Sequence, residues 1–85
     1  MNIFKHKLQY GFTYLLLPVG SQFLDFQVQD DYFVIWALAP IDTPLQERTI
    51  LVCYTGVNND IHSYDVYLGT VQHPDGLVYH AFDLL

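Results

Sequence analysis

The chain has 85 residues, of which 52% are hydrophobic and only 14% are charged, and its formal net charge is −6. This composition excludes a disordered segment, because disorder combines low hydrophobicity with high charge. It also excludes direct binding to nucleic acid, which needs a basic footprint that three basic residues cannot supply.

Short apolar runs punctuated by glycine and proline predict an all-β fold for one domain spanning residues 1–85. We expect a small antiparallel β-sandwich or partly open barrel with little helix. The expected strands are Ile3–Leu8, Phe12–Leu17, Gln22–Gln29, Tyr32–Ala39, Glu47–Tyr54, Val66–Gln72 and Leu77–Phe82. So many apolar residues in so small a body also favour an apolar contact with a partner or a second copy.

The region of the first two strands combines a basic start with a short apolar run that includes Thr13 and Tyr14. The run is shorter than the roughly 20 residues that cross a bilayer, and no small-residue cleavage site follows it. We therefore expect neither a signal peptide nor contact with a membrane.

The third and fourth strands are expected to form a hairpin with a defined register. In the segment QFLDFQVQ, apolar and polar residues alternate, which is typical of a strand with one buried face. With a two-residue turn at Asp30–Asp31, Phe26 lies opposite Ile35. In the same register Leu24 lies opposite Ala37, and both belong to the inner face.

The opposite face of this hairpin has an unusual composition for a surface in contact with water. It combines three apolar and three polar residues, and we call it the Trp36 face: Val34, Trp36, Leu38, Asp25, Gln27 and Gln29. A tryptophan ringed by polar groups resembles the anchor of a protein interface. Two alternatives follow: a terminal segment of the same chain covers this face, or a second copy or a host protein does.

The fifth strand is expected to contain the only arginine, Arg48, and the only cysteine, Cys53. A lone cysteine in an apolar run behaves as a small buried hydrophobe, and it cannot form an intramolecular disulfide, which favours a reducing cytoplasm. Arg48 either pairs locally with Glu47 or Asp42, or makes a bidentate or stacking contact with a partner or a nucleotide phosphate.

The segment HPDGL predicts the loop of a second hairpin, between the last two strands. With a three-residue loop at Pro74–Gly76, Thr70 lies opposite His80. In the same register Leu68 lies opposite Phe82.

The four histidines do not form a recognisable metal site. His73 and His80 fall on opposite faces of the expected hairpin, so they cannot share one ion, and no cysteine or acid stands at ligand spacing. The chain also has no nucleophile elbow, phosphate-binding loop or zinc-protease motif. We expect no metal, no cofactor and no enzymatic activity.

Several segments of the chain carry a resemblance to a known family. They are Pro18–Gln29 (PVGSQFLDFQVQ), Trp36–Pro40 (WALAP), Arg48, Tyr54–Gly56 (YTG) and Tyr67–Phe82 (YLGTVQ…VYHAF). Together they resemble an uncharacterised family of small proteins encoded by bacteriophages and prophages, in which the turn after QVQ is usually Asn-Gly-like. The resemblance implies a small accessory protein expressed in the cytoplasm of a host bacterium.

Accessory phage proteins of this size commonly act by stoichiometric binding to a host target, which is an argument from class. We therefore expect a host-protein-binding inhibitor of a bacterial anti-phage defence system. One alternative is a sponge that sequesters a nucleotide immune signal, for which an oligomer would have to pool its few cations. Another is a structural or morphogenetic phage component. The expected partner-binding residues are those of the Trp36 face together with Arg48, and the favoured oligomer is a homodimer.

Overall fold

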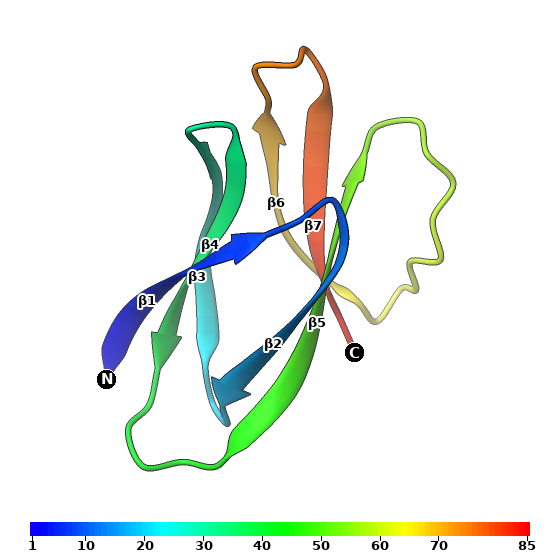
Figure 1. Ribbon diagram of the computed structural model, residues 1–85. Helices are drawn as coiled ribbons and strands as arrows, with labels where there is room; N and C mark the ends of the chain where they lie inside the picture. The colour runs from blue at the N-terminus through cyan, green and yellow to red at the C-terminus, as the bar shows by residue number, and fades with distance from the viewer.

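Figure 1 shows the computed structural model, which describes residues 1–85 as seven antiparallel strands without a helix. The strands are β1 (Asn2–Leu8), β2 (Gly11–Pro18), β3 (Gln22–Gln29), β4 (Tyr32–Ala39), β5 (Leu45–Tyr54), β6 (Val66–Gln72) and β7 (Val78–Leu84). They form two open sheets: sheet A in the order β1-β4-β3 and sheet B in the order β2-β5-β7-β6. The predicted all-β sandwich is confirmed, and each expected strand agrees with an observed one within two residues at either end.

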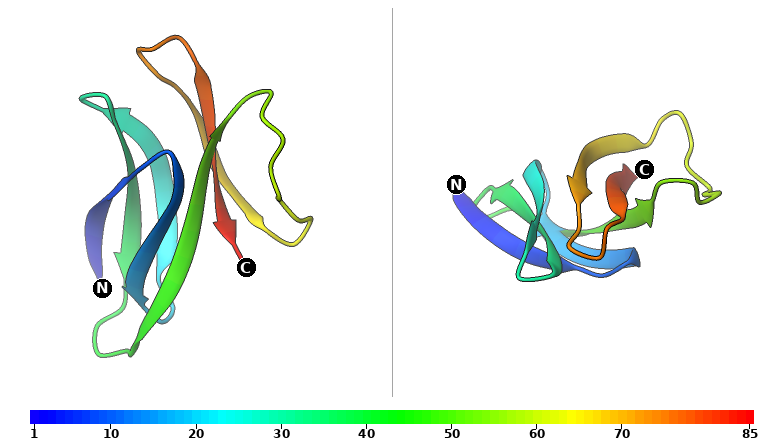
Figure 2. Two further views of the ribbon diagram at one scale, coloured as in Figure 1. Left: turned by 45° about the vertical axis from the view of Figure 1, so that its right-hand side comes forward. Right: turned by 90° about the horizontal axis from the view of Figure 1, so that it is seen from above.

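The chain changes sheet more than once along its path. β3–β4 and β6–β7 are hairpins, whereas β1 and β2 belong to different sheets although only a two-residue turn separates them. The connection from β5 to β6, residues 55–65, arches over the side of sheet B that faces away from sheet A (Figure 2). Asp65 attaches the end of this connection to the C-terminus of the chain. Its carboxylate accepts hydrogen bonds from the backbone N–H groups of His62 (2.8 Å) and Leu85 (2.9 Å). These two bonds hold the pKa of Asp65 below its ordinary value.

The turn between β3 and β4 has the predicted two-residue form. Asp30 and Asp31 have φ angles of 49° and 69°, the left-handed conformation that a type I′ hairpin turn requires and that aspartate tolerates better than most residues. The turn sets the register of the two strands, and the predicted pairing of Phe26 with Ile35 is confirmed.

The predicted pairing of Leu24 with Ala37 is wrong, because β3 contains a β-bulge. The register shifts between Phe23 and Asp25, so that Phe23 lies opposite Ala37 and Leu24 is the extra residue. Leu24 is 49% exposed. A bulge inserts one unpaired residue and bends the strand, and simple counting back from the turn cannot detect it.

The loop between β6 and β7 also has the predicted form. The N–H of His73 donates to the carbonyl of Leu77 (3.0 Å), and the N–H of Gly76 donates to the carbonyl of His73 (2.9 Å). Gly76 has a φ of 91°, which is the left-handed conformation that closes a three-residue hairpin loop. The predicted pairing of Thr70 with His80 is confirmed.

A second bulge, at Leu68 of β6, makes the predicted pairing of Leu68 with Phe82 wrong, since Tyr67 takes that position. The bulge lies next to Gly69, and a Cβ on Gly69 would lie 3.4 Å from the Cβ of Phe26 in β3. The edge strands of the two sheets therefore meet where Phe26 packs against a residue without a side chain.

The hydrophobic core lies between the sheets and draws on both of them. Its nine buried members are Leu8, Phe26, Phe33, Ile35, Ile50, Val52, Val71, Tyr79 and Ala81. Cys53 is also buried, as predicted, and burial raises the pKa of its thiol above the ordinary value. A buried thiol with a raised pKa carries little thiolate, which is the nucleophilic form.

An ion pair between Arg48 of β5 and Asp83 of β7 connects the strands on the inner side of sheet B. The Arg48 guanidinium donates to both carboxylate oxygens of Asp83, and its Nη1 donates to the backbone carbonyl of Ser21 at 3.3 Å. Its carbon Cζ lies 4.8 Å from the centre of the Phe23 ring in sheet A. Only 4% of the Asp83 side chain is exposed, so Arg48 both neutralises a buried charge and bridges the two sheets.

The prediction that Arg48 pairs with Glu47 or Asp42 is wrong. Successive residues of a strand point to opposite faces of the sheet, so Glu47 faces away from Arg48. Asp83 lies far away in the sequence and reaches Arg48 through the pairing of β5 with β7.

At the loop of the second hairpin, the Tyr79 hydroxyl donates to the carboxylate of Asp75 (2.6 Å), which also accepts from the backbone N–H of Leu77 (2.8 Å). The hydrogen bond to Asp75, with burial and the Asp75 charge, raises the pKa of Tyr79 to about 12. The hydrogen bond from Tyr79 in turn lowers the pKa of Asp75. The loop is therefore held together by a bond that strengthens when Asp75 is ionised and Tyr79 is not.

We predict that replacing Arg48 with methionine lowers the free energy of unfolding by about 3 kcal/mol, because it leaves the nearly buried Asp83 carboxylate without a partner. The double change Arg48→Met/Asp83→Leu should cost less than the single change, since no unpaired charge remains. Urea unfolding measures both. A single variant as stable as the wild type would contradict this role of the pair.

We also predict that one of the seven tyrosines ionises late in an ultraviolet alkaline titration, with a pKa near 12, and that Tyr79→Phe removes this step. Because folding raises this pKa, the stabilisation is complete below the ordinary tyrosine value of about 10 and is lost as the pH rises towards 12. Asp75→Asn keeps the oxygen that accepts from Leu77 but removes the charge, so the late step should move down towards 10. If it stays near 12 in Asp75→Asn, another group raises the pKa.

Candidate functional site

The Trp36 face lies on the side of sheet A that faces away from sheet B. β4 is the central strand of this sheet, so Trp36 lies between Lys5 of β1 and Asp25 of β3. All six residues of the Trp36 face lie together, and the outward residues of β1 that flank them are Ile3, Lys5 and Lys7. Arg48, which was predicted to bind the same partner, lies in sheet B and packs inward.

No segment of the chain covers this face, and Figure 1 shows nothing on the left of sheet A, beyond β1 and β4. The N-terminal strand lies beside β4 within the sheet and not over it. Val34 is nevertheless only 3% exposed, because it lies between Lys7 and Gln27 in the neighbouring strands, and long polar side chains shield apolar surface with their stems. Trp36 and Leu38 remain partly exposed.

The polar side chains of this face are held by contacts with each other. The Lys5 ammonium donates to Oε1 of Gln29 at 3.0 Å, and the Gln27 amide donates to Asp25 at 2.9 Å. The Lys7 ammonium lies 3.8 Å from the centre of the Tyr32 ring, a cation–π contact. These contacts order the rim around Trp36 before any partner arrives.

The distribution of charge distinguishes this face from the rest of the molecule. Both lysines of the chain lie here, whereas Arg48 is paired with Asp83 on the inner side of sheet B. The two ammonium groups of Lys5 and Lys7 are matched in number by the carboxylates of Asp25 and of Asp30 at the hairpin end, on a protein whose net charge is −6. The Trp36 face thus carries both lysines of an acidic protein and has no net charge.

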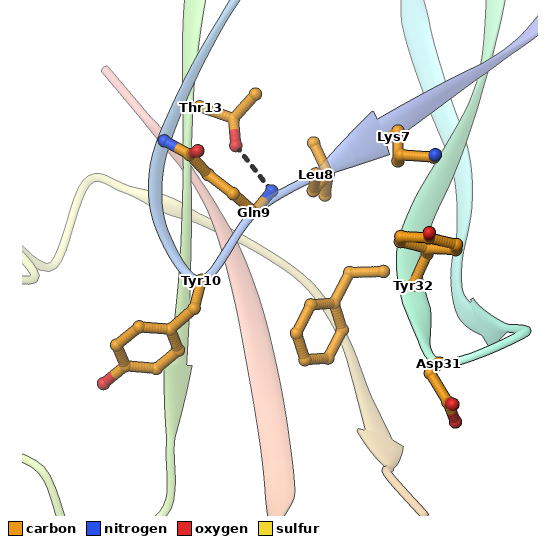
Figure 3. Close-up of a pocket in the computed structure, with 8 residues that line it drawn as sticks. Lys7, Leu8, Gln9, Tyr10, Thr13, Asp31 and Tyr32 are labelled. Carbon is orange, nitrogen blue, oxygen red and sulfur yellow. Dashed lines mark hydrogen bonds between the residues drawn. The ribbon is translucent and has the colours of Figure 1, made fainter.

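Two hollows lie at the hairpin end of sheet A. One, of about 380 Å³, opens on the Trp36 face itself and is lined by Lys5, Lys7, Gln29, Asp30, Tyr32 and Val34. The other, of about 490 Å³, is shown in Figure 3 and lies beside the β1–β2 turn; it is lined by Lys7, Leu8, Gln9, Tyr10, Thr13, Asp31, Tyr32 and Phe33. Lys7 and Tyr32 contribute to both, so they separate the two hollows.

The larger hollow, beside the β1–β2 turn, is bordered by an ordered turn and an aromatic cluster. The N–H of Gln9 donates to the Thr13 hydroxyl at 3.0 Å, which fixes the β1–β2 turn (Figure 3). The ring of Tyr10 lies 5.8 Å from that of Tyr54 and 6.1 Å from that of Tyr79. Sequence reasoning did not identify these residues, because no pattern in the sequence indicates that β1 pairs with β4 while β2 joins the other sheet.

The histidines of the second hairpin are occupied by hydrogen bonds. His80 lies between two hydroxyls, with Nε2 2.7 Å from Thr55 and Nδ1 2.9 Å from Thr70. His73 accepts from the N–H of Asp75 and contacts the carbonyl of Asp31 through Nε2, both at 3.0 Å, so it joins the loops of the two hairpins. No group of three or more histidine, cysteine or acidic side chains is arranged to hold a metal ion.

Comparisons with known proteins place the chain in a family. The chain forms no helix that could cross a membrane. Searches of curated proteins and of solved structures gave no match. A family model described as a domain of unknown function, DUF7352, matches residues 1–85 and thus the whole chain. The expectation of an uncharacterised family is confirmed, and the chain belongs to the DUF7352 family.

Proposed function

We propose that the protein binds a host protein through its Trp36 face and so inhibits a bacterial anti-phage defence system in the host cytoplasm. The observation that carries the binding function is the partly exposed Trp36 on the central strand of a sheet, with no segment of the chain over it. The phage setting is supported by the sequence motifs that resemble phage and prophage proteins.

The composition of the Trp36 face is that of a protein interface. Interfaces have an aromatic and aliphatic centre and a polar rim, and tryptophan is among the residues that contribute most to binding. Here Trp36 and Leu38 form the centre, and the ordered side chains of Lys5, Gln27 and Gln29 form the rim. Because the centre lies on a strand paired on both sides, binding costs little conformational entropy.

The charge of the face indicates the chemistry of the partner. Lys5 and Lys7 form no ion pair with an acidic side chain, and they flank Trp36 and Val34 on β1. A complementary surface would present a pocket for the indole ring with carboxylate groups beside it.

A nucleotide-sequestering function is the second candidate, and the smaller hollow on the Trp36 face favours it. Lys5 and Lys7 both line this hollow beside the Tyr32 ring. The lysines offer contacts for a phosphate, and the aromatic ring offers a stacking surface for a base. Asp30 lines the same hollow and opposes phosphate, and Arg48 is engaged by Asp83. Protein binding therefore remains the proposed function.

We predict that Trp36→Ala weakens binding to the target by about 2 kcal/mol, or roughly thirtyfold, because it truncates the central anchor. The test is a panel of bacterial defence systems challenged by phage with and without the gene, followed by affinity measurements on the target so found. Tyr67→Ala is the matched control, since Tyr67 is an exposed aromatic residue of sheet B. The proposal would be overturned if the Trp36→Ala variant inhibited the defence system as fully as the wild type and bound the target with unchanged affinity.

We further predict that Lys5→Gln/Lys7→Gln slows association with a protein target and reduces the dependence of the rate on salt, while dissociation changes less. Stopped-flow binding at several salt concentrations measures both rates. For a nucleotide, the same double change should abolish binding and Trp36→Ala should leave it intact. The two variants together therefore distinguish the two candidate functions.

A further inference from the structure

Two open sheets leave four edge strands, and an unpaired edge is a template for association with another chain. The edges are β1 and β3 in sheet A, and β2 and β6 in sheet B. Natural proteins protect such edges with charged residues, prolines, bulges or covering segments. An edge without any of these devices is a site where pairing is expected.

Three of the four edges carry such protection. β1 has Lys5 and Lys7 on its outward face. β3 has a bulge at Leu24, followed by Asp25. β6 has a bulge at Leu68. Each of these strands is therefore poorly suited to extend its sheet with another strand.

β2 is the least protected edge, since its one proline, Pro18, is the last residue of the strand. It contains no charged residue and no bulge, and it pairs in unbroken register with β5 from Gly11 to Pro18. The Phe12 carbonyl accepts from the exposed Gln9 amide at 2.7 Å, and a pairing strand would displace this side chain. Its outward side chains, Phe12, Tyr14 and Leu16, are 48%, 64% and 66% exposed. An eight-residue edge strand that is regular, neutral and apolar is the arrangement that favours pairing with another strand.

We propose that β2 pairs antiparallel with β2 of a second copy, about a twofold axis at Tyr14, so that two four-stranded sheets become one continuous sheet. This interaction is separate from the proposed function, because the Trp36 face lies on the other sheet.

The chemistry of β2 fits a second copy because the strand is self-complementary. A twofold axis at Tyr14 places Phe12 opposite Leu16 of the partner copy and the two Tyr14 rings opposite each other. Aromatic and aliphatic cross-strand pairs of this kind stabilise antiparallel sheets. The same operator makes the interface isologous, so that the assembly closes as a dimer and does not continue as a fibre.

Electrostatics permits this contact although each copy has a net charge of −6. The nearest acid in the sheet is Glu47, which lies on β5 opposite Leu16 and thus one strand away from the interface. The two β5 strands would be separated by three strand spacings, about 14 Å. This exceeds the Debye length of about 8 Å at physiological ionic strength, so the repulsion between them is largely screened.

Sedimentation equilibrium tests the assembly. The wild type should have twice the monomer mass of 9.9 kDa. Tyr14→Lys should have the monomer mass, because two ammonium groups would then lie opposite each other at the axis. Tyr67→Lys is the matched control, since Tyr67 is also an exposed tyrosine of sheet B, and it should remain a dimer.

Cysteine cross-linking tests the register. Tyr14→Cys should form a disulfide-linked dimer under mild oxidation, since residues directly opposite have Cβ atoms about 5 Å apart, close to the spacing of a disulfide. Phe12→Cys should not, because the two copies of residue 12 would lie about 14 Å apart along the strands. Phe12→Cys/Leu16→Cys should cross-link again, and the wild type, whose Cys53 is buried, is the background.

A monomeric wild type would overturn the proposal, and so would a dimer that Tyr67→Lys dissociates while Tyr14→Lys does not. Equal cross-linking of Phe12→Cys and Tyr14→Cys would exclude the stated axis. If Tyr14→Lys fails to fold, the cysteine variants decide the outcome, because they introduce no charge at the edge.

Discussion

The arrangement of the two sheets depends on the contact between Phe26 of β3 and Gly69 of β6. Phe26 is 2% exposed, and the two strands come this close because Gly69 has no side chain to keep them apart. A bulge lies beside the contact on each strand, at Leu24 and at Leu68, and bulges increase the local bend and twist of a strand. The two sheets therefore pack closely together at their β3 and β6 edges, although neither these strands nor the opposite edges β1 and β2 pair with each other.

The parts of the fold that were predictable from sequence are those determined by local chemistry. The positive φ angles of the Asp30–Asp31 turn and of Gly76 follow from residue types that tolerate them, and each turn sets the register of the residues next to it. The predicted pairing failed at Leu24 and Leu68, where the strands have bulges. The position of a bulge depends on how the strand bends to pack against the other sheet, which local sequence does not show. Partners distant in the sequence, such as Asp83 for Arg48, were equally unpredictable.

The candidate site illustrates the same limit of sequence reasoning. Alternation along β4 was sufficient to place Trp36 on the outward face, because the period of a strand is independent of its neighbours. The lysines of β1 could not be assigned to this face, since nothing local indicates that β1 pairs with β4. Their position changes the character of the face, which carries both lysines of an acidic protein around a partly exposed tryptophan.

Many of the hydrophobic residues of the chain lie on the surface and not in the core. A domain of this size cannot bury 52% hydrophobic residues, and the excess is found mainly as exposed side chains on strands, including Ile3 on β1 and Tyr14 on β2. Sheet A presents the Trp36 face, and sheet B presents the free edge of β2, so that association through β2 leaves the Trp36 face open. A dimer built in this way would carry two Trp36 faces, each on a sheet A that packs against the continuous sheet formed by the two copies of sheet B. Where a target is itself oligomeric and its spacing matches, two linked sites raise the apparent affinity without any additional contact, and a modest interface around one tryptophan would then suffice for stoichiometric inhibition.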